Sequence, residues 1–151
     1  MNNDVYYMKE ALNEARRAAI LGEIPVGAVI VDEKGVVVGT AHNLRETTND
    51  ATAHAEIVAI REASKKLKSW RLDNCSIYVT LEPCPMCAGA ILAARFKRLI
   101  YGAMDMKMGA VESIFALLSH EKLKSKIDVR AGVLEDECKN VLREFFRVRR
   151  S

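Results

Sequence analysis

The hydrophobic residues of this chain follow two periods, and the helical period comes first. In residues 5–21, apolar side chains recur three and four positions apart, and charged side chains occupy the other faces. Gly22 and Pro25 mark the end of this helix. Comparable patterns predict helices over residues 53–67, from 83–85 to about 95, and over 136–149, with a short helix within 109–120. Thr52 is the predicted N-cap of the second long helix.

Two of these helices carry predictions about packing. Residues 86–94 are apolar all round, so this helix should be covered on every side. Its small residues allow close approach to a sheet or to a second subunit. In the last helix, five apolar residues are available to the core: Val141, Leu142, Phe145, Phe146 and Val148.

Five short segments have the pattern of β-strands. Residues 25–31 form a continuous apolar run, which is typical of a strand buried on both faces. A turn leads from it to a second strand over residues 36–41, so this pair is predicted to be a hairpin. Three more strands are predicted over residues 76–81, 98–103 and 127–131, the last alternating as a half-exposed edge strand does.

This order of elements predicts the fold class. A hairpin followed by alternating helices and strands is typical of an α/β fold, here a three-layer α/β/α sandwich around a five-stranded mixed sheet. Nothing in the sequence divides the chain, so residues 1–151 are expected to form one domain. The polar stretch over residues 42–50 is long for a structureless loop, and such loops are often functional.

The composition of the chain restricts the kind of protein it can be, but it does not indicate a particular function. The net charge of +3, from 23 basic and 20 acidic residues, permits nucleic-acid binding but does not argue for it. No apolar run approaches the roughly 18 residues of a membrane span, and residues 1–4 do not resemble a signal peptide. A cytoplasmic protein with reduced cysteines is therefore expected. Cys75 and Cys138 are expected to be buried structural thiols.

Two short segments carry the candidate chemistry. Cys84 and Cys87, three apart at a helix start, place both sulfurs on one face, and the helix dipole favours their thiolates. His54 begins another helix, so the three side chains could hold one zinc ion and leave a fourth position open for water. Glu56 is two residues from His54 and cannot share its direction. It is better placed to take a proton from that water than to bind metal.

Other interpretations of these motifs remain open from spacing alone. A Cys-x-x-Cys pair can be a redox pair or half of a structural zinc site, and His-x-Glu is common by chance. A closed structural site would need a fourth ligand from Cys75, Cys138 or His42, none of which has zinc-finger spacing.

The combination of motifs resembles a known group of enzymes. His54-Ala55-Glu56 together with Pro83-Cys84-Pro85-Met86-Cys87 is the signature of the zinc-dependent cytidine-deaminase superfamily. Further segments make the chain similar to the bacterial tRNA adenosine deaminase family over nearly its whole length. These are residues 24–28, 42–43, 69–72, 78–82, 88–90, 101–103 with Asp105, Lys107 and Gly109, 132–134 and 145–147.

The resemblance implies a reaction and a set of site residues. It implies hydrolytic deamination of the wobble adenosine in a tRNA anticodon stem-loop to inosine, by a homodimer with one zinc per chain. Glu56 would protonate the adenine ring and the departing ammonia. Asn43 matches the base-contacting asparagine of the family, and the Ala55 backbone is expected to help hold the base. Asp105 and Lys107 match positions near the RNA backbone.

The chain also departs from the family pattern. Ala51 stands where a proline is usual, Glu112 replaces a usual glycine, and three methionines surround Asp105 and Lys107. The C-terminal segment holds basic and aromatic residues that could contact RNA, although the phenylalanines could instead be core and the arginines could complement the helix end. These residues are Arg143, Phe145, Phe146, Arg147, Arg149 and Arg150.

Two other functions compete with tRNA deamination. One keeps the chemistry and changes the substrate to a free base such as guanine or cytosine. The other is an RNA-binding protein with a structural zinc and no activity. Glu56 argues against the second, because a closed zinc site has no use for that carboxylate.

Overall fold

A computed structural model describes residues 3–123 and 126–150 of the chain. Its elements are α1 (Asp4–Ile20), β1 (Gly27–Val31), β2 (Val37–His42), α2 (Ala55–Leu67), β3 (Ser76–Leu81), α3 (Pro85–Ala94), β4 (Arg98–Ala103), the 3₁₀ turns η1 (Leu117–Ser119) and η2 (Glu121–Leu123), β5 (Asp128–Arg130) and α4 (Glu135–Arg150). No helix within these ranges is both long and apolar enough to cross a membrane.

The five strands form one mixed sheet in the order β2-β1-β3-β4-β5. β1 is antiparallel to both of its neighbours, β2 and β3. The strands β3, β4 and β5 run parallel. Every residue of β1 is buried, as its continuous apolar run predicted, because helices cover both faces of the sheet at this strand.

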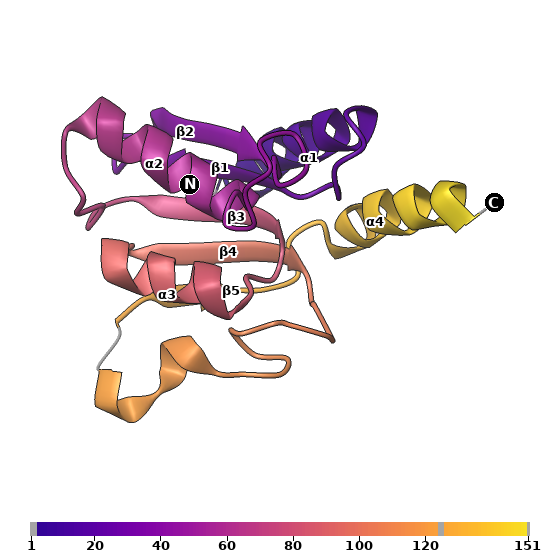
Figure 1. Cartoon of the computed structure of the whole chain (residues 1–151). Helices are drawn as coiled ribbons and strands as arrows, with labels where there is room; N and C mark the ends of the chain where they lie inside the picture. Colours follow the sequence, from indigo (N-terminus) through magenta and orange to yellow (C-terminus); the bar gives the residue numbers. More distant parts are fainter. Residues whose placement is uncertain (1–2, 124–125, 151) are drawn as a thin grey trace.

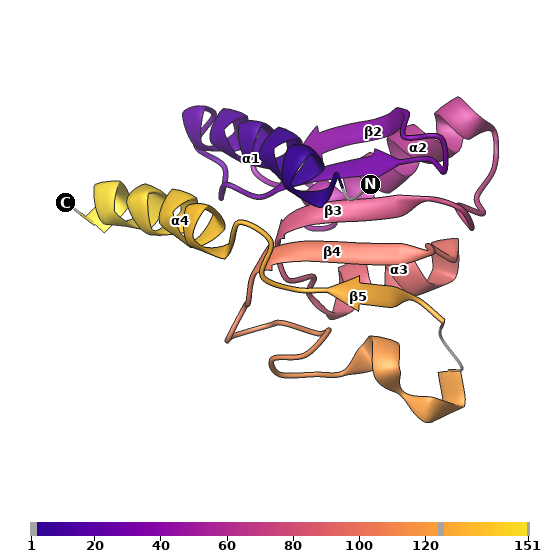
Figure 2. The ribbon, with the colours of Figure 1, turned by 180° about the vertical axis from the view of Figure 1, so that it is seen from behind.

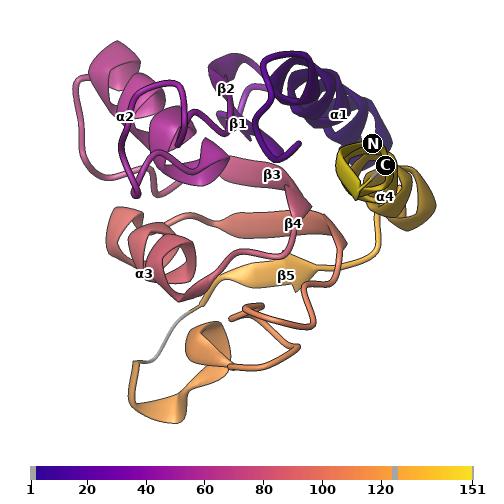
Figure 3. The ribbon, with the colours of Figure 1, turned by 45° about the vertical axis from the view of Figure 1, so that its right-hand side comes forward.

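The helices form the outer layers of a three-layer sandwich. Figure 3 shows α1 and α4 on one face of the sheet and α2 and α3 on the other, and Figure 2 shows the α1 and α4 face from the front. One apolar core joins the sheet to α2 and α3, with Ile77, Ile91 and Leu99 fully buried. A second core joins it to α1 and α4, through Met8 and Cys138. The predicted fold class, including the five-stranded mixed sheet, is confirmed.

One glycine sets the distance between α1 and the sheet. A Cβ atom on Gly27 would lie 1.9 Å from the carbonyl oxygen of Ala11 and 2.7 Å from the backbone nitrogen of Ala15. Helix and strand backbones therefore approach more closely than any side chain at position 27 would allow.

Two predictions about helix limits are wrong. The N-cap of α2 is His54, not Thr52, and the helix begins at Ala55. The Thr52 backbone and hydroxyl instead donate to Asp50 Oδ1, at 2.8 and 2.7 Å, within the preceding turn. In residues 109–120, the expected short helix is reduced to the single 3₁₀ turn η1, because most of this segment forms turns.

The expected covering of two helices is also wrong. Only the inner side of α3 packs on the sheet, so Met86 is 37% exposed and Gly89 and Ala93 are exposed as well. Figure 1 shows that α4 extends beyond the end of the sheet, and its last turns therefore have little beneath them. Consequently Phe146 and Val148 are exposed, whereas Phe145 and Cys138 provide the buried contacts of α4.

The prediction for the edge strand is partly wrong, and the prediction for the two structural cysteines is confirmed. β5 lies at the edge of the sheet, as predicted, but its three residues are all exposed and do not alternate. Within the described residues, this short strand pairs with β4 on one side only, so its other edge is open. Cys75 and Cys138 are buried free thiols, as predicted.

Candidate metal centre and catalytic site

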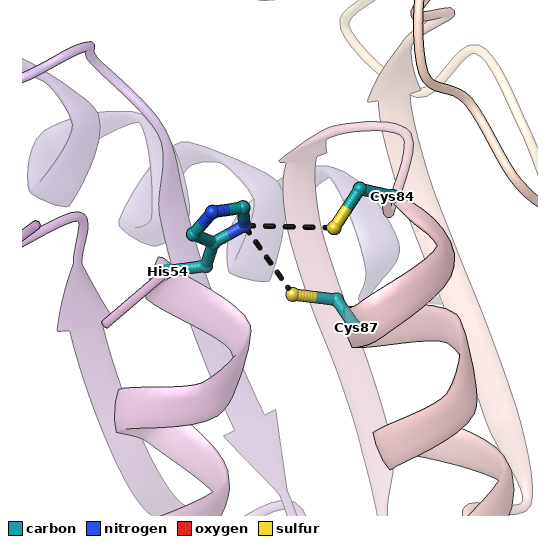
Figure 4. Close-up of side chains that lie close together, drawn as sticks. All are labelled: His54, Cys84 and Cys87. Carbon is teal, nitrogen blue, oxygen red and sulfur yellow. Dashed lines mark hydrogen bonds between the residues drawn. The ribbon is translucent and has the colours of Figure 1, made fainter. Parts of the chain in front are cut away.

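The candidate metal ligands come from the N-termini of two neighbouring helices. His54 is the N-cap residue of α2 and Cys84 is the N-cap residue of α3, both with extended backbone. Pro85 occupies the first turn of α3, where a missing N–H has no partner to lose. Neither N-cap residue uses its side chain to cap its own helix. Both side chains are therefore directed to the space between the helices, as Figure 4 shows.

The three ligand atoms have the separation that a zinc ion requires. The Sγ atoms of Cys84 and Cys87 each lie 3.6 Å from His54 Nδ1 (Figure 4). All three atoms lie within 4.8 Å of one another. A tetrahedral zinc with bonds of ~2.3 Å to sulfur and ~2.0 Å to nitrogen places such atoms about 3.5 Å apart. The predicted donor set fits zinc, and with three donors found in the described part of the chain, a tetrahedral ion would have one position left for a non-protein ligand.

The two thiols shift each other's pKa in opposite directions. A hydrogen bond from the Cys87 thiol, together with His54, lowers the pKa of Cys84 to about 4. The Cys84 thiolate in turn raises the pKa of Cys87, as does burial. The same thiolate raises the pKa of His54. The lowered pKa favours the thiolate form of Cys84, which is the form of cysteine that binds a metal ion.

Glu56 lies beside this donor set and is almost completely buried, with 4% of its surface exposed. Burial raises the pKa of its carboxyl group to about 7. A carboxyl group of that pKa can both accept and donate a proton near neutral pH, which is what general acid–base catalysis requires. Glu56 belongs to the first turn of α2 and lines the cavity beside the donor set.

The donor set borders a cavity of about 140 Å³, several times the ~30 Å³ share of one water molecule in the liquid. The predicted site residues that line it are Asn43, His54, Ala55, Glu56, Cys84 and Asp105. The remaining lining residues are Ile24, Val26, Arg45, Leu81 and Glu82. Lys107 is exposed and does not line this cavity.

Asn43 and Asp105 enter the cavity from two different loops. Asn43 is 7% exposed, its Nδ2 donates to the Ile24 carbonyl at 3.3 Å, and its Oδ1 accepts from the Arg45 backbone at 3.0 Å. Asp105 Oδ1 accepts from the backbone N–H groups of Lys107 and Met108, at 3.0 and 3.2 Å. Both side chains are thus fixed in orientation by backbone contacts before a substrate arrives.

Sequence reasoning missed Arg45 and Glu82 as parts of the site. Arg45 is an exposed cation at the cavity, and no motif distinguishes it within its polar loop. Glu82 directly precedes the metal motif, and it is 2% exposed. Burial opposes its ionisation, but backbone hydrogen bonds from Glu112 and Ser113 outweigh burial and lower the pKa of Glu82. Its position at the end of a buried strand was the one available signal.

The fold and the donor set define a deaminase of the cytidine-deaminase-like class, and comparisons with known proteins agree. The sequence model of the MafB19-like deaminase family matches residues 2–150. A tRNA-specific adenosine deaminase of Bacillus subtilis (strain 168) is 48% identical over 147 residues, which cover 97% of this chain and 91% of the relative. The chain belongs to the family of tRNA-specific adenosine deaminases.

Solved structures extend this comparison. A structure from a study of A-to-I editing by tRNA:A34 deaminases at the wobble position superposes with a TM-score of 0.87 at 46% identity, covering 91% of this chain and 99% of that one. A guanine deaminase from Bacillus subtilis superposes with a TM-score of 0.65 at 43% identity, covering 76% of this chain and 71% of that one. The class therefore includes enzymes whose names state different substrates.

Proposed function

We propose that this protein deaminates the wobble adenosine of a tRNA anticodon stem-loop to inosine, with one zinc ion per chain. The observation that carries the proposal is the placement of Glu56 beside an incomplete His/Cys/Cys donor set at a cavity. Membership of the tRNA-specific adenosine deaminase family supports the choice of substrate.

The residues divide the chemistry among them. His54, Cys84 and Cys87 would hold the zinc, which supplies an activated water molecule when bound. The Glu56 carboxylate would accept a proton from the attacking water and pass it to a ring nitrogen of the adenine. A second proton would pass through Glu56 to the amino group at C6. The bond between C6 and this nitrogen then breaks and ammonia leaves, while the water oxygen remains on C6. The net reaction consumes one water and releases one ammonia.

The remaining site residues orient the base. Asn43 presents an amide to the cavity, and an amide can pair with the donor and acceptor edge of a purine. The Ala55 backbone N–H lies in the first turn of α2, where it has no helical partner and can donate to the substrate. Asp105 and Arg45 line the cavity from the flanking loops. Lys107, exposed on the same loop as Asp105, is assigned to the RNA backbone.

The end of α4 provides a second surface for RNA. Arg143, Phe146 and Arg147 are exposed on one side of this helix, where guanidinium groups could meet phosphates and the ring could stack on a base. Arg149 has a different role, since its guanidinium lies 4.0 Å from the centre of the Phe145 ring. The Arg150 side chain lies outside the part of the molecule that the structure describes.

A second copy of this chain is the proposed partner of α3. This helix has no charged residue, and it exposes Met86, Gly89 and Ala93 at helical spacing. A self-complementary face of small residues suits a twofold dimer, in which the same helix packs against itself. Gly89→Arg should convert the dimer to a monomer in light scattering. A wild-type chain that is monomeric at micromolar concentration would refute this part of the proposal.

One experiment separates the proposed substrate from the alternative. The 43% identity to a guanine deaminase favours a free base as the competing candidate. An anticodon stem-loop with adenosine at the wobble position, free guanine and free cytosine are each incubated with the zinc-loaded protein, and products are measured by mass spectrometry. Inosine in the stem-loop supports the proposal, and conversion of a free base alone contradicts it. We propose a cytoplasmic location, which suits a tRNA substrate.

A further inference from the structure

Two loops flank the cavity, and each is folded around one buried carboxylate that does not touch the metal donors. The first loop carries Asn43 and Arg45, and the second carries Asp105. Glu23 lies within the first loop's fold and is 1% exposed, while Glu82 lies within the second and is 2% exposed. Neither carboxylate is needed for the proton transfers assigned to Glu56.

Glu82 organises the second loop through its backbone. Its Oε1 accepts from the Asp105 N–H at 3.1 Å. Its Oε2 accepts from three successive N–H groups, those of Val111, Glu112 and Ser113, at 3.1, 2.8 and 3.0 Å. The Ser113 hydroxyl also donates to Oε1. One carboxylate thus fixes both ends of the segment 105–113.

Glu23 organises the first loop in the same way. Its Oε1 accepts from the Glu46 N–H at 3.0 Å. Its Oε2 accepts from the Thr47 N–H at 2.6 Å and from the Thr47 hydroxyl at 2.7 Å. The hydrogen-bonded residues directly follow Arg45, so this contact sets where the exposed cation stands at the cavity.

A glycine shows how closely the second loop is fitted to its carboxylate. A Cβ atom on Gly109 would lie 2.5 Å from Glu82 Oε1 and 2.5 Å from the Asp105 carbonyl oxygen. The loop can therefore close around Glu82 only with glycine at this position. Glu82 also lines the cavity itself, which connects the loop's anchor directly to the substrate space.

We propose that Glu82 and Glu23 are positioning residues, which hold the two loops at the separation that the RNA substrate needs. The proposal rests on the function proposed above. A carboxylate only accepts hydrogen bonds, and here every observed partner is a donor. A glutamine would turn an NH₂ group toward these donors and release part of the loop. The loops contribute substrate contacts and no metal ligand, so releasing them should weaken substrate binding more than it slows the chemical step.

The test compares steady-state kinetics of the zinc-loaded protein on an anticodon stem-loop. We expect Glu82→Gln to raise KM about tenfold while kcat stays within about threefold. Ser113→Ala removes one donor to Glu82 and should raise KM by a smaller factor with zinc content unchanged. Glu23→Gln should act like Glu82→Gln. Glu121→Gln, at an exposed position in η2, is the matched control and should leave both constants unchanged.

Each result decides for or against the proposal. A rise in KM that exceeds the fall in kcat supports it. Unchanged KM, loss of zinc, or a fall in kcat larger than the rise in KM overturns it. If Glu82→Gln does not fold, Ser113→Ala decides by the same criterion. A wild-type protein inactive on the stem-loop would refute the proposed function instead, so the two failures are distinguishable.

Discussion

At the scale of single residues, the proposed chemistry depends on side chains at two helix starts. His54 and Cys84 have extended backbone at the N-cap positions, which directs both ligand atoms to the same point. Glu56 follows two residues later inside the first turn, where burial raises its pKa to about 7. Metal binding and proton transfer are therefore assigned to different residues and can be removed separately.

Removing the carboxylate should abolish turnover and spare the metal. Glu56→Ala is expected to keep about one zinc per chain and to lose at least ~10²–10⁴ in kcat, the range that positioned acid–base groups contribute. Metal content is measured by atomic absorption and turnover by mass spectrometry of the RNA. Glu62→Ala, at an exposed site on the same helix, is the control. Activity in Glu56→Ala close to the wild-type level would remove the proton-transfer role.

Removing one of the metal-binding thiols should instead reduce the zinc content of the protein. Cys87→Ala deletes one of three donors, so the protein should be purified with little zinc. Cys75→Ala deletes a buried thiol outside the donor set and should retain about one zinc per chain. Both are read by metal analysis after dialysis against a weak chelator. Equal zinc content in the two variants would mean that the metal lies elsewhere.

The motif residues were predictable from sequence, and the buried anchors were not. His54, Cys84 and Cys87 lie within two short segments whose residue types and helix positions predict the proposed donor set, and the fold brings the three side chains together. Glu23 and Glu82 bind backbone groups 23 to 31 residues away, and any residue type can supply a backbone N–H. A local sequence pattern therefore cannot identify these partners, and the roles of Glu23 and Glu82 could be recognised only in the folded structure.

At the scale of elements, apolar patterns located every strand, and the difficulties arose at helix ends and exposed faces. The predicted limits of β3 and β4 agree with the structure at both ends, since a short non-strand segment bounds each run. For α3 and α4, hydrophobicity predicted burial that the single chain does not provide. The hydrophobic pattern of a helix indicates which of its side chains are apolar, but it does not indicate how far the sheet extends beneath the helix.

The close approach of α1 to β1 gives a stability prediction. Gly27→Ala would bring a methyl group to 1.9 Å from the Ala11 carbonyl oxygen, so α1 must shift away from the sheet. We expect a loss of about 1–3 kcal/mol in the free energy of unfolding, the usual cost of overpacking a core. Urea denaturation followed by circular dichroism measures it. An unchanged midpoint would show that the helix can move without cost.

At the scale of the whole molecule, one carboxylate joins the first helix to three strands. Asp4 is 1% exposed. It accepts hydrogen bonds from Tyr78 on β3 at 2.7 Å, from Arg98 on β4 at 3.0 and 2.9 Å, and from Arg130 on β5 at 2.8 Å. Burial opposes its ionisation, but these contacts outweigh burial and lower the pKa of Asp4 to about 2.

This network predicts how stability depends on pH. Because the folded-state pKa lies below the usual 3.8, ionised Asp4 stabilises the fold above pH 3.8 and loses this effect as pH falls toward 2. Asp4→Asn should therefore cost about 2 kcal/mol at pH 6 and progressively less toward pH 2. Denaturant titrations of both proteins from pH 2 to 6 measure the difference. A difference that does not vary with pH would contradict this role of Asp4.

The hydrogen-bonding partners of Asp4 are synthesised one after another, and Arg130 is the last of them. Arg130 follows Asp4 by 126 residues. At synthesis rates of 5–20 residues per second, about 6 to 25 seconds separate the two on the ribosome. Through that interval α1 can lie against β1, but the edge strand that completes its anchor has not been made. The last strand to be synthesised thus adds the final contact to the first helix, and a chain stalled before it would hold that helix more loosely.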